Sequence, residues 1–233
     1  MAKTKTQQEE GIEIIENPDA LASKAEDFFN EKKNQQLVFG IGGVLALLIV
    51  AFLGYRYYIG NQNTEAQQEM FQSVFYFETD SLGKALNGDG NNFGFLEIID
   101  TYGGTDAANL ANYYAGASFL QLGDYKNAAK YLEQFSSSDY LVQARAYALI
   151  GDAYSELDDF GAAEASYKKA VAYKPNTEFT PIYLMKLAVN YEAQGKYKPA
   201  AEAYGKIVSE YSNSSFFQDA QKHKARLDGL AAE

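Results

Sequence analysis

The sequence contains no cysteine, and this absence sets the first limit on its chemistry. Without cysteine, the chain forms no disulfide bond, carries out no thiol chemistry and holds no metal through sulfur. Only one of the 233 residues is a histidine, His223, and its neighbours in sequence are Lys222, Lys224 and Arg226. A lone histidine without a cluster of carboxylates is far more often structural or exposed than catalytic.

The motifs of common enzyme classes are also missing. No P-loop, GxGxxG, HExxH or GxSxG segment occurs. The loop NGDGNNFG, residues 87–94, alternates glycine, aspartate and asparagine in the manner of a calcium site, but too few carboxylates follow at the required spacing. We therefore predict a plain turn at 87–94 and a protein that is not an enzyme, with no catalytic residue, no metal and no cofactor.

An excess of basic residues is absent too. The chain has 20 lysines and arginines against 31 aspartates and glutamates, a net charge of −11. Fourteen basic and twenty-three acidic residues, a net charge of −9, lie at positions 57–233. Nucleic acids and anionic lipid headgroups are bound by clustered lysine and arginine. The composition therefore argues against nucleic acid as a partner and against docking on an anionic lipid surface.

Charged residues disappear altogether between Leu37 and Tyr55, a stretch of nineteen positions. A helix of this length measures roughly 28 Å at ~1.5 Å per residue, close to the ~30 Å hydrocarbon core of a bilayer. A buried helix of a soluble domain keeps a polar face, which this segment lacks. A signal peptide has a shorter charged region before the apolar run and a small-residue cleavage site after it. We predict an uncleaved transmembrane helix over residues 37–58, embedded in the lipid bilayer.

The distribution of lysine and arginine around this span predicts its orientation. Lys24, Lys32 and Lys33 lie before it, whereas Arg56 is the basic residue at its other end. The side richer in basic residues stays in the cytoplasm, so the N-terminus is predicted to be cytoplasmic. The tyrosines between positions 55 and 58 suit the opposite interface, where amphipathic rings accumulate.

Small residues mark one candidate contact within the span. Gly42 and Ala46 are four positions apart, and Gly40 and Gly43 are three apart. Small residues allow a second helix to approach closely within lipid. The alternative is that glycine is simply common in membrane helices, and the sequence does not separate the two.

The segment before the span, residues 1–36, is predicted to be a cytoplasmic tail. Its first sixteen residues are polar and charged, which predicts disorder. Leu21, Ala25, Phe28 and Phe29 then fall on one helical face, which predicts a short amphipathic helix. This helix either lies at the membrane surface, contacts a partner, or serves only as a stiff lead-in to the span.

Beyond the span, three segments of similar sequence follow one another. In each, a small residue is followed three positions later by an aromatic residue, nine positions later by a second aromatic residue and twelve positions later by alanine. The small residues are separated by 35 and then 37 positions. The matching positions are Gly116, Gly151 and Ala188; Phe119, Tyr154 and Tyr191; Tyr125, Phe160 and Tyr197; and Ala128, Ala163 and Ala200.

This pattern resembles the tetratricopeptide repeat, a helical hairpin of ~34 residues. Small residues let the two helices of a hairpin cross closely, and aromatic residues fill the gap to the next hairpin. We predict an all-α fold in which a single N-terminal transmembrane helix is followed, over residues 59–233, by a tetratricopeptide-repeat α-solenoid. A capping box of Thr64 and Gln67 predicts a new helix start, and Ser215 precedes a C-terminal capping helix.

The first helices of such hairpins line a concave face that binds polypeptides. The candidate residues on this face are Tyr113, Ala117, Leu120, Arg145, Asp152, Met185, Val189 and Glu192. They are mixed in polarity, which suits a weak and permissive polypeptide contact. Tetratricopeptide domains that clamp the C-terminal carboxylate of chaperones use lysine and asparagine here. Tyr113 and Ala117 occupy the first two such positions, which argues against that mode.

The whole layout resembles one family, the ancillary subunit of the SecYEG translocon (YfgM-like). The resemblance rests on ALASKAEDFFNEKKNQQLVFGIGG before and within the span, on GYRYY at its end, and on the repeats. It implies a bacterial inner-membrane protein with a periplasmic repeat domain. The implied partners are the SecYEG translocon, a membrane-anchored periplasmic chaperone of the prolyl-isomerase type, and translocating secreted or outer-membrane polypeptides.

Two alternatives remain open from the sequence. The first is a membrane-anchored scaffold for another cell-envelope assembly. The second is the reverse topology, in which the repeats form a cytoplasmic docking platform; the lysine bias disfavours it.

The predicted topology can be tested with a reporter fused to the C-terminus. Because the N-terminus is predicted to be cytoplasmic and one span follows, a reporter that is active only in the periplasm should be active. A reporter that is active only in the cytoplasm serves as the control. Activity of the cytoplasmic reporter alone would establish the reverse topology.

Overall fold

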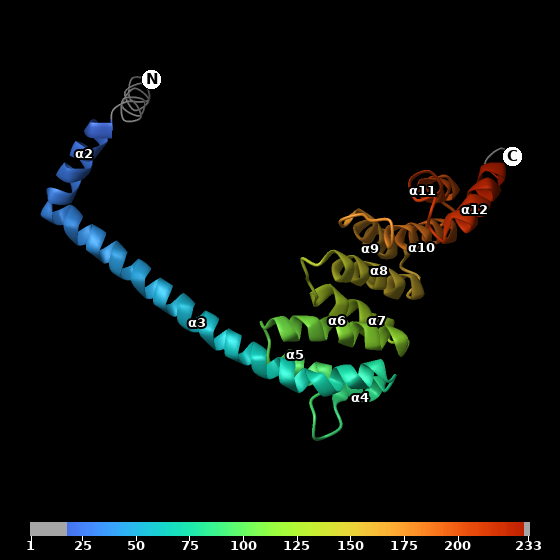
Figure 1. Cartoon of the computed structure of the whole chain (residues 1–233), viewed down its shortest axis with the longest axis horizontal. Coiled ribbons are helices and arrows are strands. Elements are labelled where there is room, and N and C mark those ends of the chain that lie inside the picture. Colours follow the sequence, from blue (N-terminus) through green and yellow to red (C-terminus); the bar gives the residue numbers. More distant parts are fainter. Residues whose placement is uncertain (1–17, 231–233) are drawn as a thin grey trace. The chain divides into compact units, whose positions relative to one another are not determined.

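The structure, a computed structural model, describes residues 18–230 and consists of helices and connecting turns throughout that range (Figure 1). It divides into two compact units, with the boundary between Tyr58 and Ile59. The segment predicted to be disordered, residues 1–16, lies outside the described residues.

The first unit contains α2, Pro18–Asn30, and the first part of α3, Lys32–Glu78. Nearly every residue at positions 37–58 is exposed, and Phe39 and Leu47 expose 78% and 72% of their surface. The helix of a soluble core buries such side chains. By length and composition, α3 is the one helix among the described residues that is suited to cross a membrane, which fits a single-pass anchor.

The prediction that a new helix begins at Thr64 is wrong. α3 continues to Glu78, and Thr64 lies inside it. The Thr64 hydroxyl donates a hydrogen bond to the Gly60 carbonyl at 3.1 Å, whereas a capping side chain would accept one from the backbone. Threonine makes this bond to the preceding turn in many helices, and no proline between the apolar run and Thr64 ends the helix.

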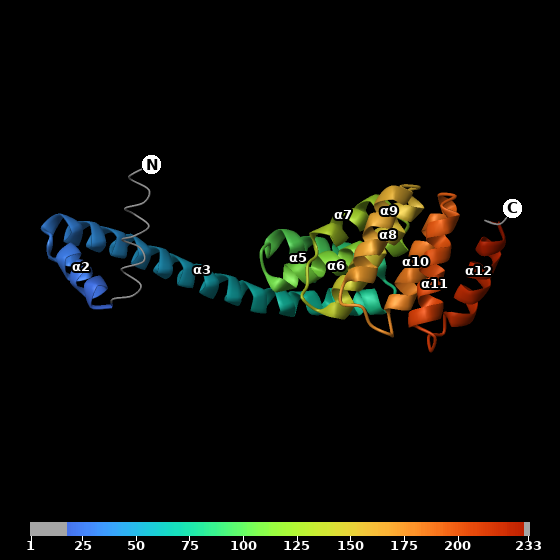
Figure 2. The same ribbon diagram turned by 90° about the horizontal axis from the view of Figure 1, so that it is seen from above.

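The second unit is a stack of helices connected by short turns (Figures 1 and 2). Three hairpins, α6/α7, α8/α9 and α10/α11, follow one another, and α12 packs on the last of them. The helices are α4 Leu82–Asn87, α5 Phe95–Thr101, α6 Asp106–Gln121, α7 Tyr125–Gln134, α8 Tyr140–Glu156, α9 Phe160–Ala172, α10 Thr180–Ala193, α11 Tyr197–Glu210 and α12 Phe217–Leu230. Figure 2 shows the hairpins stacked in chain order, which confirms the predicted all-α solenoid.

The turn inside each hairpin has the same backbone form. Gly123, Asp158 and Gly195 occupy equivalent positions with φ of 79°, 58° and 69°, the left-handed region that favours glycine. In the first two turns, the next residue, Asp124 or Asp159, accepts a hydrogen bond from a backbone N–H at the start of the second helix. These carboxylates therefore act as helix caps.

The two helices of each hairpin cross at the small residue of the repeat. A side-chain carbon on Gly116 would lie 2.5 Å from Cγ of Leu132 and 2.9 Å from the Leu132 backbone nitrogen. A side-chain carbon on Gly151 would lie 2.5 Å from the ring of Tyr167. In the third hairpin, Ala188 occupies this position and is fully buried. The small residues are therefore required by contact between helices.

The first helices of the second unit form its N-terminal core. Ala66 and Met70, in the second part of α3, pack with Phe95, Ile98 and Ala111 from α5 and α6. This cluster provides the first tetratricopeptide hairpin with a packed neighbour, as a solenoid requires at each end.

Aromatic residues fill the space between successive hairpins, as the repeat pattern predicts. Phe119 and Tyr154 pack against Ala128, Ala129 and Ala153, which come from the first and second hairpins. At the other end of the stack, α12 covers α11 through two buried side chains, Ala220 and Leu227.

The close crossing at Gly116 generates a stability prediction. Gly116→Ala should lower the free energy of unfolding by about 2 kcal/mol, because the added methyl group meets backbone atoms of α7 that move only if the helices separate. Thermal and urea unfolding of the full chain, followed by circular dichroism, measures the change.

Gly229→Ala is the matched control, because nothing lies within 4 Å of a side-chain carbon at Gly229 in α12. This change should leave stability unchanged or raise it by up to ~1 kcal/mol through helix propensity. Equal stability of the two variants would show that α6 and α7 do not cross closely at Gly116.

Candidate polypeptide-binding face

The first helices of the three hairpins, α6, α8 and α10, carry all eight residues predicted for polypeptide binding. We call their shared surface the first-helix face. A groove of about 470 Å³ lies on it between α6 and α8. The lining residues are Phe77, Leu110, Tyr113, Tyr114, Ala117, Leu120, Gln121, Leu141, Val142, Arg145, Leu149 and Phe179.

Four of the predicted residues meet in this groove: Tyr113, Ala117 and Leu120 on α6, and Arg145 on α8. The other lining residues, apart from Gln121, are apolar or aromatic. A few polar groups in a mostly apolar hollow are typical of a binding site, because apolar contact supplies affinity and the polar groups fix orientation.

The aromatic wall of the groove is held in place by ring contacts. The Tyr113 ring lies 5.7 Å from the Tyr114 ring in an edge-to-face arrangement, and 5.3 Å from the Phe135 ring. The Tyr114 ring in turn stacks on Phe95 at 5.3 Å. Burial raises the pKa of Tyr113, and the positive charge of Arg145 acts in the opposite direction. The Tyr113 hydroxyl is therefore a protonated donor at neutral pH.

Arg145 is the only charged residue of the groove lining. Its side chain is exposed, and it takes part in none of the ion pairs found within residues 18–230. Its charge acts on two neighbouring hydroxyls, Tyr113 and Tyr183, and in each case works to lower the pKa that burial raises. Arg145 thus shares the groove lining with aromatic residues and, among the described residues, forms no ion pair with a carboxylate.

Asp152, predicted for the same face, lies outside the groove lining and carries a different role. It accepts hydrogen bonds from Lys186 Nζ at 2.7 and 3.0 Å and from the Tyr167 hydroxyl at 2.8 Å. Lys186 is in α10, so this ion pair joins the second hairpin to the third. Burial and the Asp152 carboxylate both raise the pKa of Tyr167.

Glu192 forms the corresponding junction further along the stack. Its carboxylate accepts hydrogen bonds from the Tyr204 hydroxyl at 2.8 Å and from Arg226 of α12. Burial works to raise the pKa of Glu192, but the hydrogen bonds from Arg226 and Tyr204 lower it overall. His223 stacks on the Tyr204 ring at 5.1 Å, so the lone histidine is part of this structural junction.

The last two predicted residues lie away from the groove. Met185 is partly buried and packs against the C-terminal core, whereas Val189 is 54% exposed. The eight predicted residues therefore divide into four groove residues, one junction between hairpins at Asp152, one junction between the last hairpin and α12 at Glu192, one core contact and one exposed side chain.

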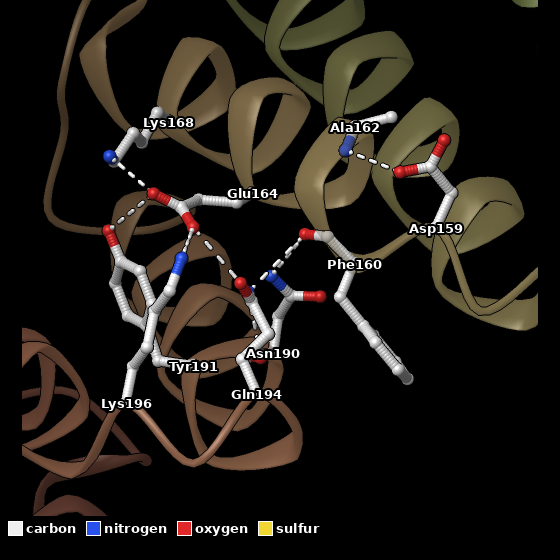
Figure 3. Close-up of polar contacts among 9 residues, drawn as sticks. All are labelled: Asp159, Phe160, Ala162, Glu164, Lys168, Asn190, Tyr191, Gln194 and Lys196. Carbon is white, nitrogen blue, oxygen red and sulfur yellow. Dashed lines mark hydrogen bonds and ion pairs between the residues drawn. The ribbon is translucent and has the colours of Figure 1, made fainter.

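A second junction between hairpins, which the sequence did not reveal, centres on Glu164 of α9 (Figure 3). Its carboxylate accepts hydrogen bonds from Lys168 Nζ at 2.7 Å and from Lys196 Nζ at 2.8 Å. The Tyr191 hydroxyl and the Gln194 amide point toward the same carboxylate, at 3.4 and 3.5 Å. The turn between α10 and α11 is thereby fastened to α9.

Some groove residues that were not predicted could have been found from their spacing in the sequence. Leu141, Val142 and Leu149 lie four and three positions before Arg145 and four positions after it, which places them on the same helical face. Phe77 and Phe179 lie outside the three repeat helices that carried the prediction, so the repeat register held no information about them.

The small residues of the apolar helix make no close contact within the chain. Gly40, Gly42, Gly43 and Ala46 are all exposed, and a side-chain carbon on any of the three glycines would have nothing within 4 Å. Their role as a contact for another helix stays a prediction.

The loop at 87–94 is organised by its own hydrogen bonds. Asp89 accepts bonds from the backbone N–H groups of Asn91 and Asn92, at 2.9 and 2.8 Å, and from the Tyr76 hydroxyl at 2.6 Å. These bonds lower the pKa of Asp89. Among the described residues, no group of three or more histidine, aspartate or glutamate side chains is placed to hold a metal ion.

Comparison with known proteins identifies the repeat. Tetratricopeptide-repeat profiles match residues 110–138, 144–177 and 183–214, which correspond to the three hairpins. No curated protein matches the chain significantly.

Solved structures share the fold. MamA of Desulfovibrio magneticus RS-1, from residue 41 to its end, is 21% identical with a TM-score of 0.52, over 64% of this chain and 77% of that one. The TPR-like repeats of a putative kinesin light chain from Podosopora anserina are 14% identical with a TM-score of 0.56, over 73% and 88%. Residues 110–138, 144–177 and 183–214 are therefore tetratricopeptide repeats, and such repeats indicate a scaffold for protein–protein interactions.

The junction at Glu164 generates a pH-dependent prediction. Its hydrogen bonds with Lys168 and Lys196 lower the pKa of Glu164 from 4.5 to about 2, so the folded state favours the anion. This contribution to stability is complete above pH ~4.5 and is lost as the pH falls towards 2. Glu164→Gln should therefore reduce the free energy of unfolding by about 1 kcal/mol at neutral pH and by much less near pH 2.

Urea unfolding at the two pH values measures this difference. Glu202→Gln serves as the control, because Glu202 is exposed on α11 and makes no ion pair among the described residues. A deficit of Glu164→Gln that stays constant with pH would rule out the ion pair as its cause.

Proposed function

We propose that the protein is a non-enzymatic accessory subunit of the SecYEG translocon, which holds a polypeptide-binding repeat domain beside the channel. One observation carries the proposal: the same chain joins an exposed apolar helix of bilayer length to a stack of tetratricopeptide hairpins with a groove. The resemblance of the tail and span to the YfgM-like family is the reason for proposing SecYEG as the channel.

The proposed arrangement places residues 1–36 in the cytoplasm, residues 37–58 in the bacterial inner membrane and residues 59–233 in the periplasm. In this position the first-helix face meets polypeptides that leave the channel and the membrane-anchored chaperone of the prolyl-isomerase type that receives them. The lysines before the span support this orientation.

Tethering is the proposed mechanism. A flexible or fixed attachment to the same membrane raises the effective concentration of a weak binding surface, into the ~mM range for short linkers. Contacts with emerging polypeptides can then be weak and rapidly reversible, as the mixed polarity of the first-helix face suggests. The domain needs no tight site to act at the channel.

The experiment is a detergent pull-down of the full-length protein from native membranes, with mass spectrometry of the recovered proteins. We expect the SecYEG channel together with a periplasmic chaperone. Gly42→Ile should reduce recovery of the channel, because a bulky side chain on the small-residue face keeps a partner helix away.

Gly54→Ile is the matched control, since both glycines are exposed in the same helix without a neighbour within 4 Å. Gly54 lies twelve positions after Gly42, which places it roughly 18 Å further along the helix axis. Recovery of another cell-envelope complex without any Sec component would contradict the translocon proposal and favour the alternative scaffold. Equal loss with both variants would contradict a specific contact at Gly42.

A further inference from the structure

The groove between α6 and α8 combines a mostly apolar lining with one positive charge, that of Arg145, which has no ion-pair partner within residues 18–230. We propose that it binds an extended polypeptide segment in which the side-chain carboxylate of an aspartate or glutamate stands next to a bulky apolar side chain, with Arg145 receiving the carboxylate. This inference rests on the proposed function, because it names the chemistry of the polypeptides that the repeat domain receives.

The apolar part of the groove is available for a partner. Leu141, Val142 and Leu149 are partly exposed, and Phe179 is 39% exposed. None of these four side chains belongs to the packed clusters of the core found in residues 18–230. Covering them with an apolar side chain removes surface from water without disturbing the core, which supplies affinity.

Charge complementarity indicates that the bound segment carries a negative charge. Two other cations already form ion pairs with carboxylates. Lys186 of α10 pairs with Asp152, and Arg226 of α12 pairs with Glu192. Arg145 has no such partner among the described residues, and the groove lining contains no aspartate or glutamate. A carboxylate from outside is the group that completes this site.

The surroundings favour arginine recognition of a carboxylate. The planar guanidinium donates two parallel hydrogen bonds to one carboxylate, and such charge-assisted bonds strengthen where water is partly excluded. Tyr113 lines the same groove as Arg145, and its hydroxyl offers a further donor there. The rest of the domain is acidic and repels an acidic segment, whereas the groove carries one positive charge and attracts it.

A side-chain carboxylate fits this site better than the carboxylate at a chain end. Recognition of a chain end uses several converging donors from adjacent helices. Here the groove contains a single cation, and α6 presents Tyr113 and Ala117 on this side. The segment is therefore expected to run through the groove with its acidic residue in the interior of the sequence.

The test measures fluorescence anisotropy with purified full-length protein in detergent. The probe is a labelled synthetic peptide with acetylated and amidated ends, whose centre reads phenylalanine, aspartate, leucine between flanking glycines and serines. Arg145→Gln should weaken binding by about tenfold or more, the value of a charge-assisted hydrogen bond. Lys198→Gln, which removes an equal charge from an exposed position on α11, should leave binding unchanged.

Two further comparisons separate the parts of the site. Phe179→Ser should weaken binding, whereas Phe71→Ser, at a 75% exposed phenylalanine outside the groove, should not. Replacing the peptide's aspartate by asparagine should weaken binding to the wild type about as much as Arg145→Gln does, and should cause little further loss with Arg145→Gln itself.

Binding that is equal for wild type and Arg145→Gln would overturn the proposal, and so would the absence of binding by the wild type. A peptide that binds only with a free C-terminal carboxylate would overturn the choice of a side-chain carboxylate. Arg145→Lys keeps the charge, so it should retain part of the affinity even where Arg145→Gln unfolds. The peptide assay contains no membrane complex, so its failure is distinct from a failure to recover SecYEG.

Discussion

The close crossing of two helices inside each hairpin is the constraint on which the rest of the structure depends. At Gly116 and Gly151 there is no space for even one additional carbon, because Leu132 and Tyr167 occupy it. This contact fixes the distance within a hairpin, and aromatic residues then fix the distance between hairpins. The first helices consequently fall side by side and present a shared face, so a repeat of small and aromatic residues determines where a partner can bind.

Carboxylates perform two separate tasks in this stack. Asp124 and Asp159 cap helices inside hairpins. Asp152 and Glu164 bind lysines of the next hairpin, and Glu192 binds Arg226 of the capping helix α12. These five carboxylates therefore help to hold the solenoid together. Arg145 differs from the cations of these pairs, because it has no carboxylate partner in the described part of the chain and lies in a mostly apolar groove. The proposed recognition of an acidic segment depends on this difference.

The repeat architecture was predictable from sequence because it depends on local spacing. A small residue, two aromatic residues and an alanine at fixed intervals encode one hairpin, and three copies encode a stack. The continuity of α3 through Thr64 was not predictable from sequence. The same residues occur in a capping box and in a helix interior, and the two cases differ only in backbone geometry. Half of the predicted face was placed in the groove, but the ion pairs of Asp152 and Glu192 join residues about one repeat apart, a long-range relation that helical spacing does not encode.

The groove includes residues from outside the two helices α6 and α8, and Phe179 is one of them. This residue directly precedes α10, the first helix of the third hairpin, while Phe77 lies in α3, which comes before α4, α5 and the first hairpin. In a linear array each repeat contacts only its neighbours, and local unfolding begins at the two ends. A polypeptide that covers both phenylalanines would connect elements that are not adjacent in the array. In the proposed binding mode, occupancy of the groove would therefore suppress fraying of the C-terminal hairpins, and the order of the whole domain would depend on whether a polypeptide is bound.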